Sequence, residues 1–96
     1  MSDKKLYRQK RQAQLDEWRA EVSKLKAKVS GHSADTQLEM NKKIKALEEK
    51  IDEGKAKLSE LAEASDDAWD SIKDGVESAW DNLRSAVGDA ASKFKK

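Results

Sequence analysis

The sequence predicts an all-α protein without β-strands, built as an antiparallel helical hairpin or as a three-helix coiled-coil bundle. Its composition favours long helices: among 96 residues there is no proline, only four are glycine, and 41% are charged. Long helices that each bury one apolar stripe have such a composition, whereas a compact globule of this length is usually richer in apolar residues. The apolar residues also recur at helical intervals along three successive segments. We therefore expect a single helical domain over residues 1–96.

A first helix is expected over about residues 4–30. Its apolar residues, from the middle onward, alternate steps of three and four, which is the spacing of a coiled-coil heptad. They are Leu15, Trp18, Val22, Leu25 and Val29. The basic residues that precede this seam are interpreted as a solvated helix end. They are Lys4, Lys5, Arg8, Lys10 and Arg11.

A break signal follows this helix at residues 30–33. Gly31 could take the left-handed backbone conformation that ends many helices, and the Ser33 side chain could cap the helix that follows. The alternative is one helix that continues through the segment, because a single glycine costs a helix only about 1 kcal/mol. The sequence leaves both alternatives open.

A second helix is expected over about residues 34–63, either separate from the first or continuous with it. Its apolar seam consists of Ile44, Leu47, Ile51, Leu58 and Leu61. Gly54 occupies the seam position between Ile51 and Leu58. A residue without a side chain at that position either allows a neighbouring helix to approach closely or makes this helix locally less stable.

A third helix is expected over about residues 66–95, with Ser65 as its N-cap. Residues 68–78 are followed at once by a near copy, residues 79–89. A repeat of eleven residues corresponds to about 3.67 residues per turn, so successive copies fall on nearly the same face of a helix. The resulting apolar stripe consists of Trp69, Ile72, Val76, Trp80, Leu83, Val87 and Phe94.

Two interpretations of this stripe compete. In the favoured one, its large side chains fill a seam against other helices, and the protein is a non-enzymatic, self-assembling coiled-coil scaffold that forms a homo-oligomer. In the alternative, the helix docks on a membrane surface, because amphipathic helices of the apolipoprotein kind are built from eleven-residue repeats. The polar face is mostly acidic, whereas helices that bind anionic lipid carry Lys and Arg there.

Charge is unevenly distributed along the chain, although the formal net charge is only +1. Residues 1–33 carry a net +5, whereas residues 34–64 and 65–96 each carry −2. The basic first segment is therefore expected to attract the two acidic ones, within one chain or between chains. Since the total is near neutral and no recognition motif accompanies the basic segment, no nucleic-acid partner is expected.

No residue set in the sequence calls for a reaction, so we expect no enzyme activity, catalytic residue, cofactor or small-molecule substrate. Cysteine is absent and His32 is the only histidine, so the common transition-metal ligand sets are missing. No apolar run reaches the roughly 18 residues of a membrane span, and no signal peptide is recognised. A cytoplasmic protein is expected, with a peripheral location at a membrane as the alternative.

Residues 68–96, AWDSIKDGVESAWDNLRSAVGDAASKFKK, resemble the C-terminal signature of a family of small bacterial coiled-coil proteins. These are called stress-response proteins after a cyanobacterial member. Residues 7–29 and 40–65 are similar to the first and middle helices of that family, so the resemblance covers nearly the whole chain. It implies an all-helical cytoplasmic protein with a link to stress, and it supplies no catalytic residue. Residues 30–32 depart from the Ala/Lys-rich helical run expected there.

Overall fold

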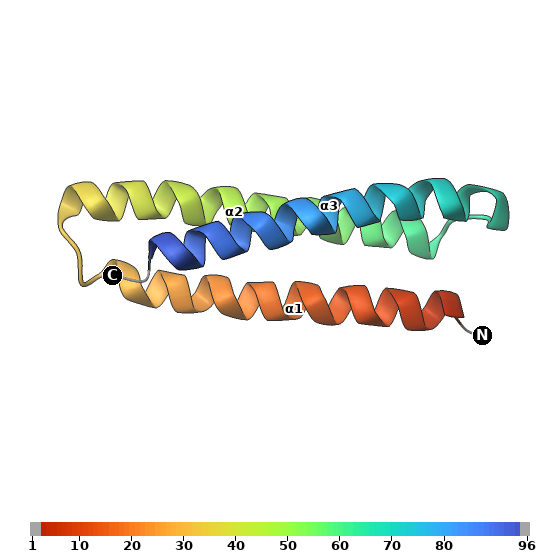
Figure 1. The fold of residues 1–96 in the computed structure, drawn as a ribbon, viewed down its shortest axis with the longest axis horizontal. Coiled ribbons are helices and arrows are strands. Elements are labelled where there is room, and N and C mark those ends of the chain that lie inside the picture. The colour runs from red at the N-terminus through yellow and green to blue at the C-terminus, as the bar shows by residue number, and fades with distance from the viewer. Residues whose placement is uncertain (1–2, 95–96) are drawn as a thin grey trace.

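The computed structural model describes residues 3–94, and this part of the chain contains three α-helices and no β-strand. Helix α1 spans Asp3–Val29, α2 spans Ala34–Ala62 and α3 spans Asp66–Lys93. They form an up-down-up bundle in which α1 and α3 run in one direction and α2 runs in the other (Figure 1). The Cα atoms extend over 51 × 18 × 17 Å, so the molecule is a rod. Of the two architectures that the sequence predicts, the three-helix bundle is the one formed.

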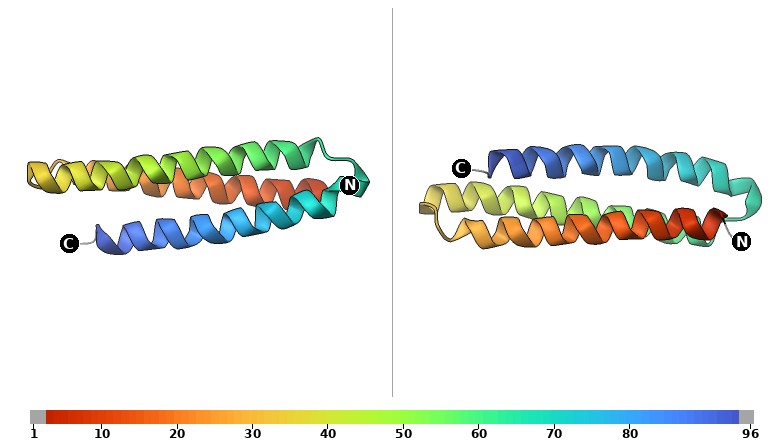
Figure 2. Two further views of the ribbon diagram at one scale, coloured as in Figure 1. Left: turned by 90° about the horizontal axis from the view of Figure 1, so that it is seen from above. Right: turned by 60° about the horizontal axis from the view of Figure 1, so that its bottom comes forward.

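The helices lie close to their expected spans. Helices α1 and α2 each end one residue before the expected end, and Lys95, the expected last residue of α3, lies outside the described residues. The helical conformation is interrupted between Val29 and Ala34, so the alternative of one continuous helix is wrong. Two further views show α3 lying along one side of the α1–α2 pair (Figure 2).

Gly31 lies in the α1–α2 connection, but its expected left-handed conformation is wrong, because no glycine in the described part of the chain has a positive φ. A turn reverses the chain instead, closed by a hydrogen bond of 3.1 Å from the His32 N–H to the Val29 carbonyl oxygen. Ser33 follows in an extended conformation, with φ −64° and ψ 162°. The Gln37 side-chain amide donates to the His32 carbonyl oxygen over 2.8 Å and ties the turn to α2.

Serine caps begin both later helices, as the sequence predicts. The Ser33 hydroxyl accepts a hydrogen bond from the Thr36 N–H at 3.4 Å, and the Ser65 hydroxyl accepts one from the Ala68 N–H at 3.3 Å. Each cap satisfies a backbone donor that the first turn of a helix leaves unpaired. The two connections are therefore fixed by local hydrogen bonds, and the direction of each helix follows from them.

A single apolar core runs along the rod between the three helices, and every seam residue named from the sequence contributes to it. The buried ones are Leu15, Val22, Leu25, Ile44, Leu47, Ile51, Leu58, Leu61, Val76, Trp80, Leu83, Val87 and Phe94. Those that are partly buried against this core are Trp18, Val29, Trp69 and Ile72. Gly54, at its expected seam position, is also buried, and the buried residues that were not named as seam members are Arg11, Met40 and Ala90. The α3 stripe is thus covered by earlier parts of the same chain.

The middle of the rod is organised around Gly54. A Cβ at this position would lie 3.3 Å from Cζ3 of Trp80, 3.1 Å from Cδ1 of Leu83 and 3.4 Å from Cδ2 of Leu15. Side chains of α1 and α3 therefore meet over the bare backbone of α2. Trp80 is fully buried here, and removing a buried tryptophan typically costs about 3–5 kcal/mol, which is a large fraction of the stability of a small domain.

Alanine substitutions at two glycines test this close approach. Gly88→Ala is expected to raise the melting temperature, because an added Cβ there meets nothing within 4 Å beyond its own helix and alanine is favoured over glycine in helices by about 1 kcal/mol. Gly54→Ala gains the same preference but inserts a methyl group among three packed side chains, where overpacking costs about 1–3 kcal/mol. Thermal unfolding followed by far-UV circular dichroism should place Gly54→Ala below the wild type. An equal rise for both variants would contradict the contact.

Candidate functional site

The side chain of Trp80 joins the core to a cluster of aromatic and charged residues between α1 and α3. Its Nε1–H donates a hydrogen bond of 3.4 Å to the Arg11 backbone carbonyl oxygen. The rings of Trp18 and Trp80 lie with their centroids 6.2 Å apart at an interplanar angle of 53°. The indole therefore fixes α3 against α1 through both an apolar and a polar contact.

Arg11 is the charged residue at the centre of this cluster, and only 9% of its surface is exposed. Its guanidinium forms an ion pair with Glu77 on α3 and donates a hydrogen bond of 2.8 Å to Oε1 of Gln14. The Nε atom of Arg11 is buried without a hydrogen-bond partner among residues 3–94. Because a buried charge without its counter-ion is strongly unfavourable, Glu77 is required wherever Arg11 is buried.

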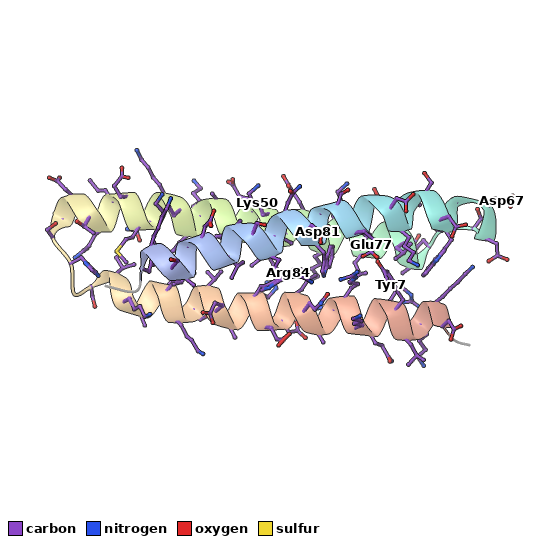
Figure 3. The ribbon with its side chains drawn as sticks, in the orientation of Figure 1. Tyr7, Lys50, Asp67, Glu77, Asp81 and Arg84 are labelled. Atoms are coloured by element: carbon purple, nitrogen blue, oxygen red, sulfur yellow. The ribbon has the colours of Figure 1, made fainter. Side chains whose placement is uncertain are left out.

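Tyr7 extends the cluster towards the end of the rod (Figure 3). Its ring meets the Trp69 ring edge-on, with the centroids 6.2 Å apart. The Arg11 guanidinium carbon and the Lys73 Nζ lie 5.1 Å and 5.0 Å from the centroid of the Tyr7 ring, which are cation–π distances. The Tyr7 hydroxyl is buried without a hydrogen-bond partner in the described part of the chain. Burial raises the pKa of this phenol above its ordinary value, and the nearby Arg11 charge opposes the rise.

Ion pairs join the basic α1 to both of its neighbours, as the charge distribution suggests. They are Arg19–Asp52 (3.5 Å) and Lys26–Glu48 (2.5 Å) to α2, and Lys4–Asp66 and Arg11–Glu77 to α3. The hydrogen bond from Lys4 holds the pKa of the exposed Asp66 carboxyl below its usual value. The expected attraction between segments is thus realised within one chain.

The interpretation of the N-terminal basic residues as a solvated helix end is wrong for Arg11, which is buried, and Lys4 is engaged in an ion pair. Arg11 lies four residues before Leu15, and Tyr7 lies four residues before Arg11, so both continue the face of α1 that carries the seam. This spacing is the signal that sequence reasoning missed. Tyr7 and Glu77 of this cluster were not named as packing residues from the sequence, and Arg11 was named only as part of a solvated helix end.

The two copies of the tryptophan repeat are not equivalent in the structure. Trp80 and Leu83 of the second copy are buried at the middle of the rod, whereas Trp69 and Ile72 of the first copy are only partly buried. Position along the rod explains the difference, because the second copy faces Gly54 and the first lies near the start of α3. Trp69 has Tyr7 and Lys4 as neighbours instead.

Among the concave features of the described residues are four open grooves between the helices. Two lie between α1 and α2 and two between α2 and α3, with volumes of about 210–320 Å³. Three of them are lined by charged side chains of both signs, and the fourth is lined by the basic Arg8 and Lys55. Within residues 3–94 no three His, Cys, Asp or Glu side chains are grouped so that they could hold a metal ion. What the arrangement presents chemically is a set of grooves lined by charged side chains.

None of the helices in the described residues is both apolar enough and long enough to cross a bilayer. No protein-family model, curated protein or solved structure matches the chain. Function is therefore inferred from the residues and their geometry.

Titration of the single tyrosine tests the buried part of the cluster. Because burial favours the neutral phenol, the pKa of Tyr7 in the folded protein lies above the value of about 10 that it has in the unfolded chain. The stability that this difference contributes is fully present below pH 10 and is lost as the pH rises through the folded pKa. Ultraviolet absorbance should give a pKa above 10 in buffer and an ordinary one in denaturant. Equal values would mean that water reaches the phenol.

Proposed function

We propose that the protein is a non-enzymatic helical scaffold that assembles with further copies of itself. The observation that carries this proposal is that the apolar stripes of all three helices are covered within one chain, which produces a rod 51 Å long. The rod is extended, and 41% of the residues of the chain are charged. The outer faces of such a rod suit repeated side-by-side contacts better than they suit a reaction, for which a concave pocket is the usual setting.

The resemblance of residues 68–96 to small bacterial stress-response proteins supports a stress-related, cytoplasmic role for this scaffold. The filled core is consistent with such a role, since a rod with its apolar seam closed can persist without a partner. The self-association that we propose takes place between rods that are already folded.

Sedimentation velocity and equilibrium over a hundredfold range of concentration test the proposal. We expect the weight-average mass to exceed that of the 10.8 kDa chain and to rise with concentration, while helix content by circular dichroism stays constant because each rod is folded before it associates. The mass of a single chain at every concentration would refute self-association.

A second candidate function is docking of α3 on a lipid surface, and two features of α3 favour it. Trp69 and Ile72 remain partly exposed near its start. Gly75 and Gly88 lie inside the helix with no neighbour within 4 Å of an added Cβ, so they lower the stability of the helix without serving the packing. A helix with these properties can separate from its partners more easily than α1 or α2.

Co-sedimentation with phosphatidylcholine vesicles, with and without phosphatidylglycerol, tests this second function. If α3 docks on lipid, the protein should pellet with vesicles, and Trp69→Ser should reduce the bound fraction severalfold because tryptophan suits the membrane interface. Leu6→Ser is the matched control, because Leu6 is 63% exposed on α1 and lies outside the α3 stripe. Absence of binding to both vesicle types, or an equal loss in both variants, would exclude docking by α3.

A further inference from the structure

The groove between α2 and α3 has a floor of small residues. Its two halves share the rim residue Lys50, so they form one continuous depression along the rod, with volumes of about 320 and 210 Å³. Gly75, Ala79, Ala86 and Ala90 line it from α3. At Gly75 the space is open, because an added Cβ would meet nothing within 4 Å.

A row of lysines forms the α2 rim of this groove. It consists of Lys43, Lys50 and Lys57, spaced seven residues apart. At 1.5 Å per residue the row is roughly 21 Å long. None of the three forms an ion pair with any residue in the range 3–94. Glu53 and Asp89 also line the groove, and with Lys93 at its end the lining keeps a positive charge.

A row of aspartates with the same spacing runs along the outside of α3. It consists of Asp67, Asp74 and Asp81, which are exposed and also seven residues apart. We call this row the acidic ridge. Its members, too, form no ion pair among the described residues. Figure 3 shows Lys50 on α2, Asp67 at the start of α3 and Asp81 about halfway along it.

We propose that the acidic ridge of one copy docks in the α2–α3 groove of another, so that each aspartate meets one lysine. Residues seven apart on a helix lie on almost the same side, so two straight rows of equal length and opposite charge can pair along their whole length. This holds whether the docking helix runs parallel or antiparallel to α2. The small floor of the groove gives the incoming helix room to approach.

A second copy of this chain is the occupant because both complementary surfaces are present on every copy. The ridge and the groove are different surfaces, so two copies can pair reciprocally, each ridge in the groove of the other, or can join head-to-tail with one ridge and one groove left free. Head-to-tail assembly continues into a filament or closes into a ring. The inference rests on the proposed self-association and specifies the surfaces that perform it.

Charge reversal on each side tests the contact. Lys43→Glu, Lys50→Glu and Lys57→Glu together should weaken self-association at least about a hundredfold, because like charges are then opposed at the interface. Asp67→Lys, Asp74→Lys and Asp81→Lys together should do the same. An equimolar mixture of the two triple variants should associate again, since each surface then finds its opposite on the other variant. Helix content by circular dichroism equal to that of the wild type in each triple variant excludes misfolding as the reason for the loss.

A matched control changes the same number of charges elsewhere. Lys5→Glu, Lys42→Glu and Lys45→Glu together alter three exposed lysines that line none of the four grooves described and form no ion pair within residues 3–94, and association should persist. Suppose that the wild type associates. If the groove variant and the ridge variant then associate equally well, or if mixing them does not restore association, the ridge-and-groove contact is wrong, while the proposal of a self-associating scaffold is not contradicted. If the wild type is a monomer at every concentration, both the ridge-and-groove contact and the self-associating scaffold are wrong.

Discussion

The contact between Trp80 and Gly54 sets the geometry of the whole rod. Only where α2 has no side chain can an indole from α3 and a leucine from α1 reach the same point. The position of Trp80 then determines the axial position of α3 relative to α2. It therefore determines which residues of the repeat lie at the centre of the rod and which lie near its end. The tryptophan repeat is regular in sequence, but its partner surface has only one such opening, so the two copies have different environments.

An ion pair between α1 and α3 adds a second constraint to the one that the core supplies. In the observed arrangement the buried Arg11 guanidinium is paired with Glu77. Separating these two side chains without another carboxylate in the place of Glu77 would leave the guanidinium unpaired in an apolar setting, which is strongly unfavourable. The Trp80 hydrogen bond to the Arg11 carbonyl oxygen acts in the same direction. We infer that this cluster selects the arrangement of helices that the core stabilises.

Sequence periodicity predicts the helices, the seam residues and both serine caps, because these depend on neighbours within one helical turn or on the apolar pattern. It does not predict the conformation of Gly31, where a local turn made the left-handed backbone unnecessary. Nor does it predict the burial of Arg11, because this burial depends on pairing with Glu77, which lies 66 residues away in the chain. The unequal burial of Trp69 and Trp80 likewise follows from tertiary position, which the repeat itself does not encode.

The two proposed functions make opposite demands on this fold. Docking α3 on a bilayer requires Trp80 and Leu83 to leave α1 and α2, and the apolar surface that α1 and α2 would then expose costs about 25 cal/mol per Å². Assembly through the acidic ridge uses side chains that are already in water and leaves the core intact. A rod whose stripes are closed within one chain therefore favours partners that meet its outer faces. Lipid docking can compete with self-association only if Gly75 and Gly88, which weaken α3, make the free-energy cost of separating α3 from α1 and α2 smaller than the gain from binding lipid.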